Sequence, residues 1–116
     1  MWVLALGTND RLKSSAQLRT DANTVLSAIG PDHFVWIGIG FYAGNDPVAA
    51  RVNSILSEAV AAAPNGSYTS WNSWIHSPLR GSGANWVYPA DPIHMTKQGY
   101  AIRNEFYGRV VNRLWP

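Results

Sequence analysis

Apolar and polar positions alternate along the chain with two different spacings. Residues 2–6 and 34–39 are short, almost entirely apolar runs, whereas residues 15–29 and 48–60 carry apolar side chains at intervals of three and four. A short apolar run is typical of a strand that is covered on both faces. The longer spacing indicates a helix with one buried face. Together they predict parallel strands connected by helices, which is an α/β fold.

Both helices have clear boundaries in the sequence. The first should end at Gly30-Pro31, because glycine and proline do not continue a helix. The second should begin with Asp46 as its N-cap and Pro47 in its first turn, and end before Pro64. The positions that we expect the first helix to bury are Leu18, Ala22, Val25, Leu26 and Ile29. Those of the second helix are Val48, Val52, Ile55, Leu56, Ala59 and Val60.

The second half of the chain has a weaker pattern. Aromatic residues, threonine and isoleucine favour a strand over residues 68–75. Residues 76–95 contain three prolines and two glycines without a sustained period, which predicts a long loop. A last helix should run from Lys97 to Leu114 with Thr96 as its cap. We expect it to bury Ile102, Phe106, Val110 and Leu114.

The predicted order is strand, helix, strand, helix, strand, loop and helix, in a single α/β domain over residues 1–116. Ligands of open parallel sheets bind beyond the carboxyl ends of the strands. Three segments should meet at that edge, namely Gly7-Thr8-Asn9-Asp10, residues 40–45, and the end of the long loop at His94. We expect them to form one rim.

Composition narrows the classes of function. Seven arginines and two lysines are spread along a chain of net charge +2, which argues against a nucleic-acid partner and against a polybasic membrane patch. The absence of cysteine excludes disulfides, thiol nucleophiles and thiolate metal sites, and it leaves the compartment undetermined. The three histidines have no metal-binding spacing. No apolar run is long enough to cross a bilayer.

Two short segments could carry chemistry. Asp91 and His94 are three residues apart before a helix, so the carboxylate can orient one imidazole nitrogen and leave the other free as a base. Asn9 follows a buried strand and can present its side-chain amide to a developing oxyanion. Both segments also have simpler interpretations, since Asp91 can cap a turn and Asn9 is an ordinary turn residue. We expect His33 and His76 to be structural or surface residues.

Aromatic side chains are numerous near the predicted rim. Most are expected to pack in the core and loops, and some could line an acyl or sugar pocket. They are Trp36, Phe41, Tyr42, Trp71, Trp74, Trp86 and Tyr88.

Two sequence blocks occur together and in order. They are Val-Leu-Ala-Leu-Gly-Thr-Asn-Asp on the first predicted strand and Asp-Pro-Ile-His-Met-Thr-Lys-Gln-Gly-Tyr before the last helix. With these blocks the chain resembles the C-terminal part of the SGNH/GDSL hydrolase family. The resemblance implies a flavodoxin-like three-layer α/β/α fold with a parallel sheet that lacks its first strands.

The resemblance also implies roles for four residues. Asn9 would donate to the oxyanion hole and Gly7 would shape its loop, while His94 would act as the general base and Asp91 would orient His94. The implied activity is hydrolysis of a small carboxylic ester, such as an acetylated sugar, a lipid or another acyl ester. The mechanism would be acyl transfer through a serine, with neither a metal nor a cofactor.

The chain departs from this family in the nucleophile. The family's Gly-Asp-Ser turn, which carries the serine, and its second oxyanion-hole glycine are absent from these residues, and Met1 directly precedes the strand leading to Gly7. Ser77 and Ser82 share the long loop with His94 but lie in no comparable turn. One edge of strand 2–6 should then be unpaired. We therefore expect either a partner chain that supplies the missing strand and serine, or a homo-oligomer formed through this edge.

Two other functions remain open. The chain could be a non-catalytic module that uses its crevice and aromatics to bind a carbohydrate or acyl ligand. It could also be a small α/β domain in which both motifs are coincidental, an interpretation that a large separation between Asn9 and His94 would establish.

Overall fold

The computed structural model describes residues 1–41, 46–77, 87–88 and 91–114. Its centre is a parallel sheet of three strands in the order β1-β2-β3, formed by β1 (Trp2–Leu4), β2 (Phe34–Gly38) and β3 (Gly66–Ser70). Trp2 lies opposite Phe34 across the first pair, and Phe34 lies opposite Gly66 across the second. The predicted α/β class and parallel sheet are confirmed.

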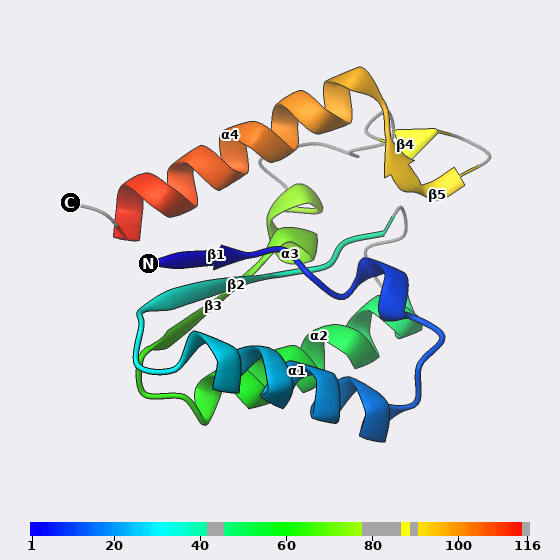
Figure 1. Cartoon of the computed structure of the whole chain (residues 1–116). Coiled ribbons are helices and arrows are strands. Elements are labelled where there is room, and N and C mark those ends of the chain that lie inside the picture. Colours follow the sequence, from blue (N-terminus) through cyan, green and yellow to red (C-terminus); the bar gives the residue numbers. More distant parts are fainter. Residues whose placement is uncertain (42–45, 78–86, 89–90, 115–116) are drawn as a thin grey trace.

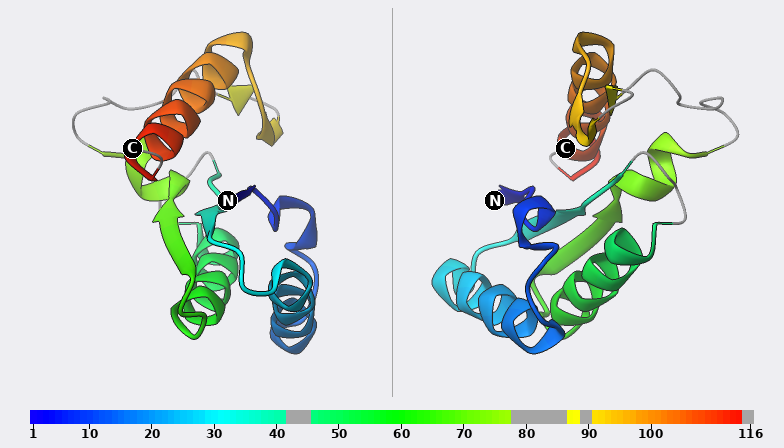
Figure 2. Two further views of the ribbon diagram at one scale, coloured as in Figure 1. Left: turned by 60° about the vertical axis from the view of Figure 1, so that its left-hand side comes forward. Right: turned by 90° about the vertical axis from the view of Figure 1, so that its right-hand side faces the viewer.

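Helices cover both faces of the sheet (Figure 1). On one face lie α1 (Ser15–Ile29) and α2 (Pro47–Ala61), and on the other lie the short α3 (Trp71–Ile75) and α4 (Lys97–Leu114). Figure 2 shows the same layers from two other sides, with α4 separated from α1 and α2 by the sheet. Both long connecting helices begin and end where the sequence predicts.

The two faces of β2 build two separate apolar cores. All five residues of β2 are buried. Because successive side chains of a strand point to opposite faces, Phe34 and Trp36 pack with α1 and α2, and Val35 and Ile37 pack with α3 and α4. The first core contains Leu18, Ala22, Ile29, Ile39, Phe41, Ala49, Val52, Ile55, Leu56 and Val60. The second contains Trp71, Ile75, Phe106 and Val110.

The caps explain where the helices begin. The Ser14 hydroxyl accepts the N–H of Gln17 at 3.2 Å, and the Gln17 side chain accepts the N–H of Ser14 at 3.1 Å, which forms a capping box. Asp46 accepts the N–H of Val48 at 2.8 Å and that of Ala49 at 3.0 Å. The predicted cap of α2 is thus confirmed.

The predicted strand over residues 68–75 is wrong in its second half. β3 ends at Ser70, whose hydroxyl accepts the N–H of Ser73 at 3.0 Å and so caps α3. Trp71 and Ile75 lie one helical turn apart and are both buried against α4. The aromatic and β-branched residues that suggested a strand therefore form the buried face of a helix.

The predicted loop over residues 76–95 also contains secondary structure. β4 (Val87–Tyr88) and β5 (Asp91–Met95) form an antiparallel pair with an irregular register. The α4 cap is as predicted, because the Thr96 hydroxyl accepts the N–H of Gly99 at 3.1 Å. Leu114, predicted to be buried, is 37% exposed near the end of α4.

β1 is less covered than its apolar sequence predicts. It is the end strand of the sheet, and among the described residues it pairs with β2 alone, so its predicted open edge is confirmed for that part of the chain. Trp2 is 52% exposed and Val3 is 41% exposed. The expected burial on both faces is therefore wrong, because α1, α2 and α4 converge on β2 instead.

Candidate active site

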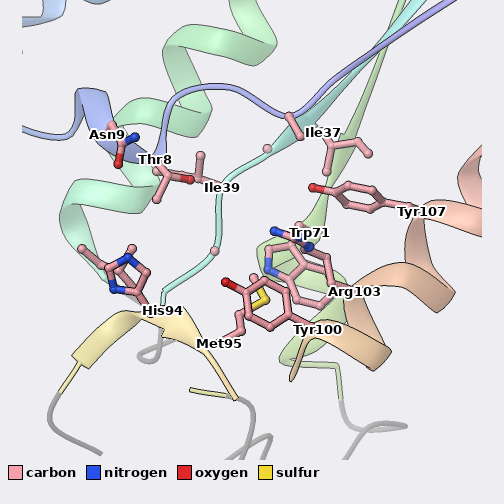
Figure 3. A pocket seen from close by; sticks show the side chains of 14 residues that line it. Thr8, Asn9, Ile37, Ile39, Trp71, His94, Met95, Tyr100, Arg103 and Tyr107 are labelled. Carbon is pink, nitrogen blue, oxygen red and sulfur yellow. The ribbon is translucent and has the colours of Figure 1, made fainter. Parts of the chain in front are cut away.

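A pocket of about 360 Å³ opens at the carboxyl edge of the sheet, between the loops after β1 and β2 and the β5–α4 segment. Figure 3 shows it from close by. Asn9 and His94 both line it, although they are 85 positions apart in the chain. The two residues are thus not separated in the way that would have established the coincidence hypothesis.

The Gly7–Asp10 loop is a single 3-10 turn, η1 (Thr8–Asp10), that begins directly after a left-handed residue. Gly7 has φ +119°, a conformation that side-chain-bearing residues rarely adopt. The N–H of Asp10 donates to the Gly7 carbonyl at 3.0 Å and closes the turn. A Cβ at position 7 would lie 3.3 Å from Cδ1 of Leu56. The backbone conformation of the turn therefore favours glycine, and the packing on α2 leaves little room for a Cβ.

Polar contacts hold the chain after this turn in place. Arg51, on α2, donates to the carbonyl oxygen of Arg11 at 2.8 Å and to that of Lys13 at 3.0 Å. Lys13 in turn forms an ion pair with Asp10 at 2.8 Å. The Asn9 side chain is exposed at the rim of the pocket. The loop that carries Asn9 is thus tied to a helix beneath the sheet.

Asp91 and His94 form a hydrogen-bonded pair on β5. Nδ1 of His94 lies 2.5 Å from Oδ2 of Asp91. Oδ1 of Asp91 accepts the backbone N–H groups of Ile93 and His94, each at 3.0 Å. These two backbone hydrogen bonds, followed by that of the His94 side chain, lower the pKa of Asp91 to about 2. Asp91 is consequently an anion at neutral pH.

This pair leaves the second imidazole nitrogen available. No described residue bonds Nε2 of His94, and the His94 side chain is 71% exposed, compared with 39% for Asp91. In Figure 3 the His94 ring lies on the same side of the pocket as Thr8 and Asn9. A carboxylate on Nδ1 and a free Nε2 that faces a pocket is the arrangement of a general base and its orienting acid.

The loop after β2 is fixed by two side chains that the sequence analysis did not assign to the site. Asn53 of α2 donates to the Ile39 carbonyl and accepts the Ile39 N–H, both at 2.8 Å. Nε2 of His76 lies 2.9 Å from the Phe41 carbonyl oxygen. His76 is therefore structural, as predicted. In the sequence, the one feature that could have pointed to Asn53 is its position next to Val52, where a polar residue borders the apolar stripe of the helix.

The opposite wall of the pocket is aromatic. Trp71 packs against Gly40, where a Cβ would lie 2.6 Å from Cδ1 of the indole. Tyr100, Arg103 and Tyr107 line the same wall from α4. The sequence predicts Trp71 as a rim residue but not these three, because they lie beside the apolar stripe of the helix and belong to no motif.

The other predicted rim aromatics lie elsewhere or outside the described part. Trp36 and Phe41 belong to the core, and Trp74 packs on Trp71 with ring centroids 5.6 Å apart. Tyr42 and Trp86 fall outside the described residues, as do residues 43–45 of the second predicted rim loop. The side chain of Tyr88 is also outside them.

The described lining contains no serine. Ser77 lies in the described part of the chain but away from this pocket, and Ser82 is outside that part. Thr8 supplies the one aliphatic hydroxyl among the described lining residues. The described histidines, aspartates and glutamates form no group that could hold a metal ion. In that same part of the chain, no helix combines the length and apolarity needed to cross a membrane.

No protein-family model matches the chain, and neither a curated protein nor a solved structure matches it. Inference about function therefore depends on the pocket and its residues.

Proposed function

We propose that this chain provides the oxyanion-binding and proton-transfer parts of an SGNH-type serine ester hydrolase. The observation that carries the proposal is that Asn9 and His94 line one pocket while Asp91 holds Nδ1 of His94. Each motif alone is common in proteins. Their convergence from opposite ends of the chain, in the family's order, is what supports a shared catalytic role.

The proposed roles follow from the geometry of acyl transfer. Nε2 of His94 would take the proton from an attacking hydroxyl and later return it to the leaving alcohol, and Asp91 would keep the imidazole in the required tautomer. The Asn9 amide would donate to the oxyanion that develops on the ester carbonyl, a contribution of about 3 kcal/mol when the donor is preorganised. Gly7 would fix the turn that presents this amide.

The attacking serine would come from a further segment. The outer edge of β1 is the place for it, because that edge is unpaired among the described residues and its apolar side chains are exposed. A strand added there, parallel to β1, would end beside Thr8 and Asn9, since parallel strands finish at the same edge of a sheet. A Gly-Asp-Ser turn at the end of such a strand would face His94.

Ester hydrolysis with and without this segment tests the proposal. The chain alone should hydrolyse p-nitrophenyl acetate negligibly. Supplying a strand that ends in Gly-Asp-Ser, as a companion chain or fused ahead of Met1, should create an activity. His94→Ala should then lower turnover by about 10³-fold or more and Asn9→Ala by roughly 10²-fold to 10³-fold.

Two controls accompany the measurement. His33→Ala changes an exposed histidine at the opposite end of β2 and should leave turnover unchanged. Replacing the supplied serine by alanine should abolish turnover. Strong hydrolysis by the chain alone that disappears in His94→Ala would mean that the nucleophile is already present, with Thr8 the first candidate. Full activity of the completed enzyme with His94→Ala would refute the proposal.

The aromatic wall favours a second candidate function. Trp71, Tyr100 and Tyr107 border the pocket, and rings of this kind hold sugars or acyl groups without any chemistry. A non-catalytic binding module would retain its affinity for such a ligand when Asp91 and His94 are replaced together. An ester hydrolase would lose turnover under the same replacement.

The open edge of β1 also makes association testable. Either a partner chain or a second copy should cover it, because an exposed apolar strand edge pairs readily with another strand. Light scattering on the purified chain should therefore detect a species larger than the monomer, or a complex once the partner is added. A monodisperse monomer in both samples would contradict this part of the proposal.

A further inference from the structure

The aromatic wall of the pocket includes a positively charged side chain, that of Arg103. Cζ of Arg103 lies 4.8 Å from the ring centroid of Tyr100 and 5.4 Å from that of Tyr107, three residues before and four residues after it on α4. All three residues line the same pocket as His94 (Figure 3). Both rings attract the guanidinium, because an aromatic ring attracts a cation over its face.

Arg103 has no anionic partner among the described residues. Its Nε is buried without a hydrogen bond, and it forms neither an ion pair nor a hydrogen bond with a described side chain. By contrast, Arg109 on the same helix pairs with Glu105 at 2.9 Å, and Arg19 pairs with Glu58 at 2.6 Å. A partly buried guanidinium without a carboxylate is unfavourable unless something else balances its charge.

The remaining surface of the guanidinium suits an oxyanion. The planar guanidinium can donate two parallel hydrogen bonds from its N–H edge to a carboxylate or phosphate. The pocket is too large for a bare ion, and apolar side chains such as Ile37 and Met95 share its lining with Trp71. A ligand with an oxyanion attached to an apolar or aromatic body fits these features.

We infer that the pocket binds a ligand bearing a carboxylate or phosphate group, with Arg103 as the residue that binds this anion. The inference deepens the proposed function. Where it concerns the reaction it rests on that function: the ester substrate carries a negative charge on the part that contacts Arg103. In Figure 3, His94 and Arg103 lie at different ends of the pocket, so the anion would be bound away from the reacting carbonyl.

Benzoate and benzamide test the inference on the chain itself, since they share one shape and differ in charge. Their binding can be followed by two-dimensional NMR at constant ionic strength. Benzoate should bind at least about tenfold more tightly than benzamide, which is the effect of one charge-assisted hydrogen-bonded pair. Phenyl phosphate in place of benzoate shows which oxyanion is preferred.

Two matched variants separate recognition from general attraction. Arg103→Gln should remove the preference for benzoate and leave benzamide binding unchanged. Arg109→Gln removes the same charge from the same helix at an exposed ion pair and should keep the preference within about twofold, because exposed charges interact weakly with a distant site. Unfolding midpoints measured in parallel show that both variants are folded.

The inference is refuted if benzoate and benzamide bind equally, if neither binds at millimolar concentration, or if both variants weaken benzoate binding alike. None of these measurements needs a nucleophile or turnover. Failure here therefore leaves the ester-hydrolase proposal intact, and failure of hydrolysis leaves the anion preference intact.

Discussion

Gly7→Ala is the substitution whose effect can be worked out most directly from the geometry. At φ +119° an alanine is strained, and such backbone conformations cost about 1–3 kcal/mol for residues other than glycine. The new Cβ would also lie 3.3–3.4 Å from methyl groups of Leu56, Ile39 and Val52, which must shift by a few tenths of an ångström. We expect a total loss of about 2–3 kcal/mol in the free energy of unfolding.

For a domain of this size, each kcal/mol lowers the unfolding midpoint by roughly 4 °C. Gly7→Ala should therefore lower the midpoint by about 8–12 °C in thermal unfolding followed by circular dichroism. Gly108→Ala is the matched control, since it lies in α4 with open space around it and should stabilise by about 0.5–1 kcal/mol. A loss below about 2 °C for Gly7→Ala would refute the assigned turn geometry.

Two further predictions concern residues around the pocket. Asn53→Ala leaves the N–H and carbonyl of Ile39 without their 2.8 Å partners, so it should lower the free energy of unfolding by about 2–3 kcal/mol in urea titration; a loss below about 0.5 kcal/mol would contradict the bidentate contact. The Asp91 carboxyl should titrate near pH 2 by NMR, because its hydrogen bonds favour the anion. Since its folded pKa is depressed, Asp91 stabilises the fold above pH of about 4, and this contribution is lost as the pH falls through about 2. His94→Ala should raise this pKa but leave it below the ordinary value, because the backbone hydrogen bonds remain; an unchanged Asp91 titration in this variant would contradict the pairing.

The sequence predicts the regular elements where one pattern dominates. The helices over residues 15–29 and 97–114 follow from apolar spacing and caps, and β2 follows from an uninterrupted apolar run. The error over residues 68–75 has a physical reason. A five-residue helix is too short to display a helical period, and its residues Trp71 and Ile75 also favour strands.

The residues of the candidate site can be predicted from the sequence where they belong to short local motifs. Asn9, Asp91 and His94 are recognisable because each motif has a fixed spacing. The roles of Arg103 and Asn53 cannot be predicted in this way, because they depend on which face of a helix meets a pocket or a loop. The sequence of one helix does not show what packs against it.

The central claim is that the Asn9 loop and the Asp91/His94 pair face one pocket, and NMR can test it directly. The side-chain amide signals of Asn9, assigned by their loss in Asn9→Ala, should change position in His94→Gln, because the imidazole ring across the pocket is then removed. His33→Gln, which changes a histidine at the other end of β2, should leave them unchanged. Asn9 signals that do not respond to His94, or that respond equally in the two variants, would contradict the common site.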